Sequence, residues 1–204
     1  MWVYVFGSLV RGEFESDSDI DILTIGTEEE LTSLPSFCLK YTKRSIEECF
    51  QRGDLFAHHL FSESKLVFST DGSDILGKLG YPHPYSTFKE DARQFLNIAH
   101  YSLCELQQQC CTTVYEMGLL YMCMRDLAMI ATYLGGSVSF SKYSPYKTTV
   151  SLELPLEKYR LLKKSRVAST RGKTLMNNLR LNNEDYKIIL DWLNFIEKFI
   201  YDKL

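Results

Sequence analysis

The pattern of apolar and polar residues divides the chain into two parts. In the first 80 residues, short runs of β-branched and aromatic side chains alternate with polar turns. After residue 86, apolar residues recur at intervals of three and four, the spacing of amphipathic helices. The connector at 80–85 contains two prolines, which cannot continue a helix. The pattern therefore predicts an α+β fold, with a small mixed-sheet domain at 1–80 and an all-α helical bundle at 87–204.

Strands and short helices are expected to alternate in the first part. Strands are expected at 2–6, 19–25, 37–42 and 65–69. Helices are expected at 28–34, 45–52 and 56–61. Thr27 and Ser45 are the expected N-caps of the first two helices, and Gly53 is expected to end the second.

The segment 19–25 reads D-I-D-I-L-T-I, and its alternation predicts a strand with two unlike faces. Asp19 and Asp21 are two residues apart, so both carboxylates are expected on the same face. Ile20 and Ile22 are expected on the opposite face, where they would anchor the strand in the core.

Three long helices are expected in the second part, at 87–109, 112–134 and 185–201. The second is apolar almost all round, as expected of a buried central helix. Residues 165–173 are interpreted as a mobile loop. The stretch 158–180 carries eight Lys and Arg residues and no acid. It is either an RNA contact or a solvated face.

Composition narrows the function classes only slightly. The net charge of −3 gives no global argument for nucleic-acid binding, so any such surface must be local. No targeting segment is recognised, and 111–134, the stretch nearest to a membrane helix, contains charged residues. We therefore expect a cytoplasmic protein without a membrane partner. The six cysteines form no C-x-x-C pair and are expected to be reduced thiols.

The residues that carry chemistry lie near the N-terminus. The first expected strand ends at Gly7-Ser8, where small residues allow a ligand to approach the backbone. Two adjacent carboxylates, Asp19 and Asp21, repel each other unless a cation neutralises them. Mg²⁺ favours such hard oxygen ligands together with substrate phosphates. The pattern therefore predicts a metal and nucleotide site suited to phosphoryl or nucleotidyl transfer.

Gly7-Ser8, ten intervening residues and Asp19-Ile-Asp-Ile22 together resemble the signature of the DNA polymerase β-like nucleotidyltransferase superfamily. Arg11-Gly12 and Ser18 are further similar to the minimal and kanamycin nucleotidyltransferase groups. The resemblance implies that Asp19 and Asp21 hold two catalytic Mg²⁺ ions and that Gly7 and Ser8 bind the phosphates of an NTP. It also implies a C-terminal HEPN-like helical bundle that binds substrate or a partner.

The implied reaction transfers an NMP from an NTP, ATP included, to a hydroxyl of a protein, a tRNA or a small molecule. Members of this size are common in toxin–antitoxin and phage-defence systems. The alternative is a weak or inactive module that binds nucleotide, RNA or a partner protein. Homo-oligomerisation and pairing with a partner protein both stay open.

Two features keep these alternatives open. Arg11 is either a triphosphate contact or a surface arginine. Active members of the superfamily carry a third carboxylate on a later strand, but the expected strand at 37–42 contains no acid. The remaining candidates are Glu47, Asp54, Glu105 and Glu116, each of which is also explained as a helix charge.

Overall fold

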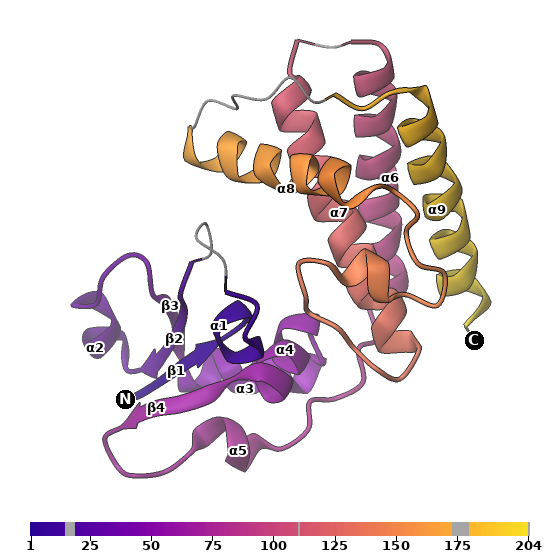
Figure 1. Ribbon diagram of the computed structural model, residues 1–204. Helices are drawn as coiled ribbons and strands as arrows, with labels where there is room; N and C mark the ends of the chain where they lie inside the picture. The colour runs from indigo at the N-terminus through magenta and orange to yellow at the C-terminus, as the bar shows by residue number, and fades with distance from the viewer. Residues whose placement is uncertain (15–18, 110, 173–179, 204) are drawn as a thin grey trace. The chain divides into compact units, whose positions relative to one another are not determined.

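The computed structural model describes residues 1–14, 19–109, 111–172 and 180–203 (Figure 1). It contains two units, Met1–Thr87 and Phe88–Leu204, and each has its own hydrophobic core. A four-stranded sheet belongs to the first unit, and helices form the second. The predicted α+β fold is confirmed.

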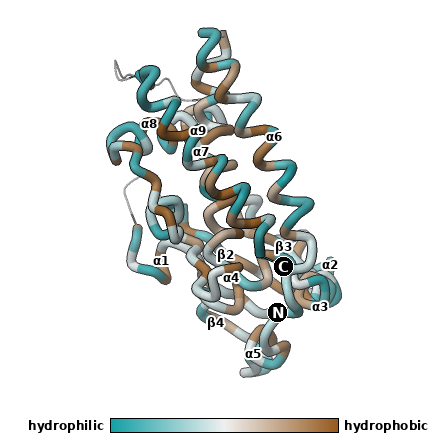
Figure 2. Tube along the Cα trace, turned by 90° about the vertical axis from the view of Figure 1, so that its right-hand side faces the viewer, coloured by the Kyte–Doolittle hydropathy of each residue, from teal (hydrophilic) through white to brown (hydrophobic). Residues whose placement is uncertain are grey.

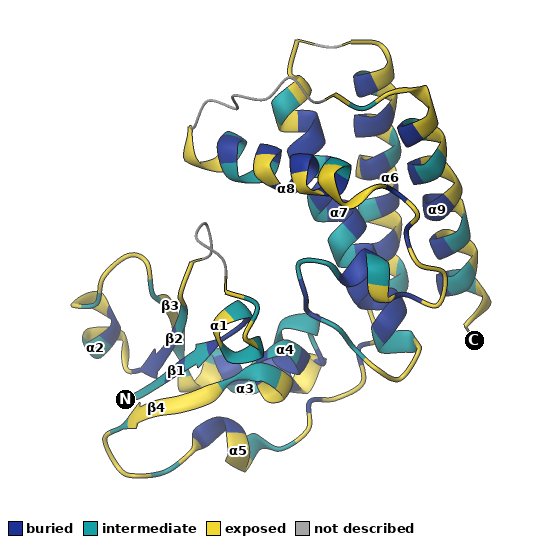
Figure 3. Ribbon diagram, viewed as in Figure 1, coloured by how far each residue is buried: buried dark blue, intermediate teal, exposed yellow. Residues whose placement is uncertain are grey.

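The sheet of the first unit has the strand order β3-β2-β1-β4. Its strands are β1 (Trp2–Phe6), β2 (Asp21–Gly26), β3 (Leu39–Thr42) and β4 (Lys65–Ser69). β1 pairs antiparallel with β2 and β4, whereas β2 and β3 are parallel, so the sheet is mixed as predicted. β4 forms one edge and is exposed along most of its length (Figure 3).

Five helices accompany this sheet in the described part of the first unit. They are α1 (Ser8–Arg11), α2 (Glu28–Thr32), α3 (Lys43–Arg52), α4 (Leu55–Glu63) and α5 (Ile75–Leu79). Thr27 is the N-cap of α2, as expected, and it forms a capping box with Glu30. The N-cap of α3 is Thr42 and not Ser45, because the Thr42 hydroxyl accepts the Ser45 N–H at 3.1 Å. Gly53 ends α3 in the left-handed conformation, as expected.

The core of this unit lies on the face of β1 and β2 that carries Tyr4, Phe6, Leu23 and Ile25. Side chains of α3, α4 and α5 pack against that face. The prediction that Ile20 and Ile22 anchor the strand in the core is therefore wrong. Ile20 is 51% exposed and lies before β2, and Ile22 alternates away from Leu23. Asp21 instead shares the face of Leu23 and Ile25.

The connector packs onto the first unit. The His83 N–H donates to the Phe50 carbonyl at 2.9 Å, and the buried His58 ring lies 3.1 Å from the His83 carbonyl oxygen. A β-carbon on Gly53 would lie 2.2 Å from that same oxygen. The expected linker is thus part of the first unit as far as Thr87.

In the second unit, the described residues form four α-helices and a short 3-10 helix. They are α6 (Phe88–Gln107), α7 (Thr113–Leu134), η1 (Ser144–Lys147), α8 (Leu156–Arg171) and α9 (Asn183–Asp202). Figure 2 shows hydrophilic and hydrophobic residues alternating along α6, as expected of a helix with one buried face. α7 packs against all the other helices and is the central helix that the sequence predicted.

By length and composition α7 could cross a membrane, which the sequence interpretation had discounted. In the structure, however, 67% of its most apolar window is buried inside the unit. A mostly buried core helix can have the same length and apolar composition, so these two properties are weak evidence for a membrane span.

The interpretation of 165–173 as a mobile loop is wrong as far as Arg171, because these residues continue α8. Lys173 lies outside the described residues. Ser165 and Ala168 are buried on the inner face of α8, and this buried face stabilises the helix. The described cysteines form no disulfide.

Candidate metal and nucleotide site

The candidate site lies where β1 ends and β2 begins. Phe6 is opposite Asp21 in the antiparallel ladder, so the Gly7-Ser8 turn and the N-terminal end of β2 lie at the same edge of the sheet. Gly7 has a φ of 72°, a left-handed value that glycine adopts without strain. This geometry turns the chain from β1 directly into α1.

Asp21 approaches the backbone of Gly7 closely. A β-carbon on Gly7 would lie 2.5 Å from Asp21 Oδ2, which is shorter than any ordinary contact. The absence of a side chain at Gly7 therefore creates the space that the Asp21 carboxylate occupies. The structure thus brings together the turn and one of the two acids that the sequence singled out.

Asp19 lies two residues before β2, outside the ladder, and is exposed. Asp21 is half-buried at the first position of the strand. Because Asp19 has no ladder position, strand alternation does not fix the direction of its side chain. A shared orientation of the two carboxylates stays a prediction.

Arg11, at the end of α1, is only 16% exposed in its side chain. Its Nε lies 3.1 Å from Glu13 Oε2, and its Nη1 bonds to Glu63 Oε2 on α4. His59 Nε2 lies 3.0 Å from the same Glu63 oxygen, and the His59 ring packs edge-on against Phe6. The low exposure of Arg11 does not fit the interpretation of this residue as a surface arginine. Phosphate binding by Arg11 stays a prediction.

Sequence reasoning missed Glu63 as a member of this cluster. The spacing of His59 and Glu63, four residues apart on one helix, was a signal that they share a face. No local signal links them to Arg11, which lies 52 residues before Glu63.

Residues 1–73 match the family model described as polymerase beta, nucleotidyltransferase. This first unit is a polymerase beta-type nucleotidyltransferase domain. The match covers all four strands of the sheet, including the turn at Gly7 and both aspartates. Residues 74–204 lie outside it, and no curated protein matches the chain.

Within the described part of the nucleotidyltransferase domain, no third acid is grouped with Asp19 and Asp21. Glu47 lies 3.7 Å from Lys43, and Asp54 pairs with Arg52 at 2.6 Å, so both have simple explanations as helix charges. Glu105 and Glu116 belong to the helical unit. Among the described residues, no three His, Cys, Asp or Glu side chains are grouped as a metal site would require.

The two carboxylates of this domain nevertheless supply some of the oxygen ligands that a hard cation needs. Members of the family generally use a divalent metal and an NTP. Asp19 and Asp21 offer carboxylate oxygens, the ligands that Mg²⁺ prefers, and Mg²⁺ commonly completes its shell with waters and substrate phosphates. Two carboxylates therefore fit an ion that binds together with its nucleotide better than an ion that binds alone.

Proposed function

We propose that the protein is a Mg²⁺-dependent nucleotidyltransferase that moves an NMP from an NTP to an acceptor hydroxyl. The close approach of the Asp21 carboxylate to Gly7 is the observation that carries this proposal. It puts a metal-binding type of side chain directly beside a backbone turn in a domain of the nucleotidyltransferase family. Nucleotide phosphates and a metal ion need these two elements side by side.

In the proposed reaction, Gly7 and Ser8 orient the phosphates through their backbone N–H groups, and Asp19 and Asp21 hold Mg²⁺. The acceptor oxygen attacks the α-phosphorus, the bond to pyrophosphate breaks, and the hydroxyl proton is lost. Bound Mg²⁺ would lower the pKa of that hydroxyl and would neutralise charge on the leaving pyrophosphate. The Glu63 carboxylate keeps Arg11 in place beside the turn.

The acceptor is a protein side chain, a tRNA 3′ end or a small molecule, and ATP is one of the candidate NTPs. A role in toxin–antitoxin or phage-defence systems fits a protein or RNA acceptor better than an antibiotic. The helical unit is the proposed binding region for this acceptor or for a partner. Within it, the basic stretch 158–180 is the proposed contact for RNA.

Label transfer tests the proposal. The purified protein is incubated with each α-³²P-NTP, Mg²⁺ and cell extract, and labelled products are separated by size and by protease or RNase treatment. We expect transfer from at least one NTP and its loss in Asp19→Asn and Asp21→Asn. Asp191→Asn, at an exposed position of α9, is the matched control and should transfer label normally. Normal transfer by both site variants would overturn the proposal.

The lack of a grouped third acid among the described residues favours a second candidate, a binding module without catalysis. This module would retain nucleotide or RNA binding, or would only pair with a partner protein. The same samples distinguish the two functions. Nucleotide binding without label transfer from any NTP supports the module, whereas transfer that depends on Asp21 supports the enzyme.

A further inference from the structure

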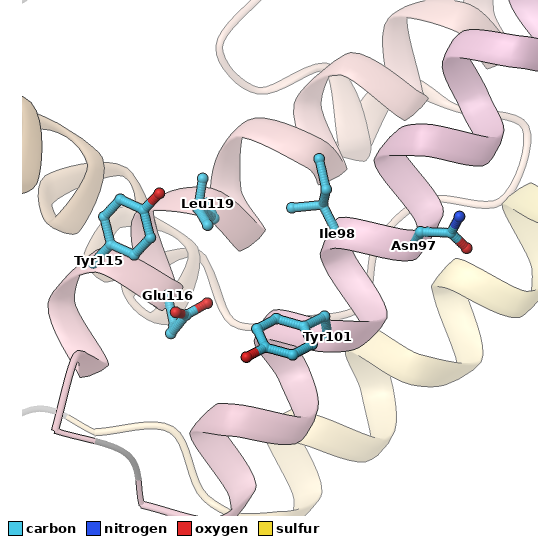
Figure 4. A pocket seen from close by; sticks show the side chains of 6 residues that line it. All are labelled: Asn97, Ile98, Tyr101, Tyr115, Glu116 and Leu119. Carbon is cyan, nitrogen blue, oxygen red and sulfur yellow. The ribbon is translucent and has the colours of Figure 1, made fainter.

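The helical unit contains a pocket between α6 and α7 that the proposed reaction does not use. Its volume is about 490 Å³, within the usual range for small-ligand sites. The lining residues are Asn97, Ile98, Tyr101, Tyr115, Glu116 and Leu119 (Figure 4). Glu116 is the only charged residue among these six, so the lining carries negative charge.

Glu116 is more than nine-tenths buried, with 6% of its surface exposed. Its Oε2 accepts a hydrogen bond of 2.8 Å from the Ser102 hydroxyl, and it lies in the first turn of α7, where the helix dipole favours negative charge. Within the described ranges, no Lys, Arg or His lies within 4.0 Å of it as an ion-pair partner. A buried carboxylate that has only a neutral hydroxyl partner still attracts a cation.

Two tyrosines flank this carboxylate. Tyr101 is 63% exposed and Tyr115 is 52% exposed, and Figure 4 shows their rings on either side of Glu116. Ile98 and Leu119 add apolar surface beside them. Exposed aromatic rings around a carboxylate form a surface that binds a flat cation. The rings stack on the faces of the cation, and the carboxylate accepts hydrogen bonds from its edge.

A second acid strengthens the negative field. The carboxylates of Glu105 and, to a smaller extent, Glu116 raise the pKa of the Tyr101 hydroxyl, and partial burial adds to this effect. The same field would repel the phosphate of a nucleotide. Charge complementarity therefore favours a cationic ligand over a nucleic-acid base.

We propose that the pocket between α6 and α7 binds the guanidinium group of an arginine side chain from a partner polypeptide. A guanidinium is planar, stacks on tyrosine faces and donates two parallel hydrogen bonds to a carboxylate. An ammonium group cannot make the stacked, forked contact, so lysine binds more weakly. This binding is independent of the nucleotidyltransferase reaction.

NMR titration with short peptides tests this proposal. The probe is acetyl-Gly-Gly-Arg-Gly-Gly-amide, compared with the same peptide carrying lysine or citrulline, the neutral isostere of arginine. We expect saturable shifts at Ile98 and Leu119 with the arginine peptide and about tenfold weaker binding of the citrulline peptide. Equal affinity for citrulline or for lysine would overturn the guanidinium assignment. Preferential binding of GMP at the same residues would show a nucleotide pocket instead.

Variants locate the binding site. Glu116→Gln keeps the size of the side chain and its hydrogen bond to Ser102 but removes the charge, so arginine binding should weaken about tenfold. Tyr101→Ala and Tyr115→Ala change residues that are more than half exposed, and each should also weaken binding. Glu197→Gln, at an exposed position of α9, should leave binding unchanged. Wild-type affinity in both tyrosine variants would contradict the proposal.

Discussion

Gly7 meets two requirements at once. Its φ of 72° is left-handed, and the position that a β-carbon would take lies 2.5 Å from Asp21 Oδ2. The first requirement concerns the backbone: Gly7 has φ 72° and ψ −141°, outside the αL region, and another residue in this conformation costs on the order of 1–3 kcal/mol. The second concerns the acid itself, because a side chain at this position would displace the carboxylate. The two effects can be separated by comparison with another glycine.

Gly72 is that comparison. It has a φ of 71°, and an added β-carbon would have no neighbour within 4 Å. We expect both Gly7→Ala and Gly72→Ala to lower the melting temperature, because each puts a side chain on a residue with a positive φ. Only Gly7→Ala should also weaken Mg²⁺·NTP binding, by about tenfold or more, since it alone displaces Asp21. Fluorescent-nucleotide titration measures the difference, and equal nucleotide affinity in both variants would refute the role assigned to the Gly7–Asp21 contact.

Glu63 connects α4 to α1 through Arg11 and also accepts from His59. Hydrogen bonds to charged groups contribute about 1.5–3 kcal/mol when they are shielded from water, and the Glu63 side chain is 15% exposed. We expect Glu63→Gln to lower the free energy of unfolding of the first unit by an amount in this range. Glu48→Gln removes an exposed i,i+4 pair with Arg44 and should cost less than about 0.5 kcal/mol. Urea denaturation compares the two variants, and equal losses would show that the Arg11–Glu63 pair is no more than a surface contact.

At the scale of elements, the connector is fixed to α3 and α4 rather than loosely joining the units. The buried His58 ring lies 3.1 Å from the His83 carbonyl, which is consistent with its Nε2–H donating to that oxygen. Burial lowers the pKa of His58 below its usual 6.5, and this effect exceeds the opposing effect of the hydrogen bond. Protonation of His58 therefore favours the unfolded state.

Because folding lowers the pKa of His58, the stability of the first unit decreases as the pH falls. The stabilisation is complete above pH 6.5 and is lost as the pH falls below it towards the lowered pKa of the folded state. Titration of His58 alone changes the free energy of unfolding by at most about 1.4 kcal/mol per pH unit. His58→Gln keeps a donor but does not titrate, so its unfolding free energy should depend less on pH between 5 and 6.5. His100→Gln serves as the control, and an unchanged slope in His58→Gln would contradict the assignment.

The basic residues of α8 fall into two groups. Lys158 lies 3.1 Å from Asp185, which is 3% exposed and belongs to the capping box of α9. Arg160 and Lys164 are exposed on the same helix. We expect Lys158→Gln to destabilise the helical unit with little direct effect on RNA binding. If the stretch binds RNA, Arg160→Gln/Lys164→Gln should weaken that binding and reduce its salt dependence by about two ion equivalents. Filter binding at several salt concentrations measures both, and an unchanged salt slope would exclude these side chains from an RNA contact.

The sequence predicted the elements whose signals are local. The N-cap at Thr27, the helix end at Gly53 and the strand end at Gly7 each depend on a few neighbouring residues. The buried face of β2 was not predictable in the same way. Alternation shows that two faces exist, but the helices that pack on Tyr4 and Leu23 decide which one is the core.

The ends of α8 and the cluster around Glu63 show the same limit. The sequence at 165–173 indicates a mobile loop, but buried side chains such as Ser165 and Ala168 continue α8 through packing as far as Arg171. Arg11 and Glu63 meet only because α1 and α4 come together in the folded domain. The sequence therefore predicted the motif residues of the candidate site but gave no signal for Glu63, which holds Arg11 in place.

For the whole molecule, the family assignment and the proposed chemistry lie in the first unit. Residues 1–73 match the nucleotidyltransferase model, and the helical unit at 88–204 has its own core and its own pocket. Substrate choice and partner binding are proposed for that second unit, so the two functions can be tested separately. Removal of the arginine pocket should leave nucleotide binding intact, and removal of Asp21 should leave peptide binding intact.

The most direct test of the central claim is calorimetric titration of the whole protein with a non-hydrolysable ATP analogue. The measurement needs no acceptor, so its result does not depend on which hydroxyl is modified. We expect binding in Mg²⁺, no measurable binding in EDTA, and at least about tenfold weaker binding in Asp21→Asn than in Asp191→Asn. If ATP fails, the same titration with GTP, CTP and UTP analogues completes the test. Equal affinity in Mg²⁺ and EDTA, or in the two variants, would contradict a metal and nucleotide site at Gly7 and Asp21.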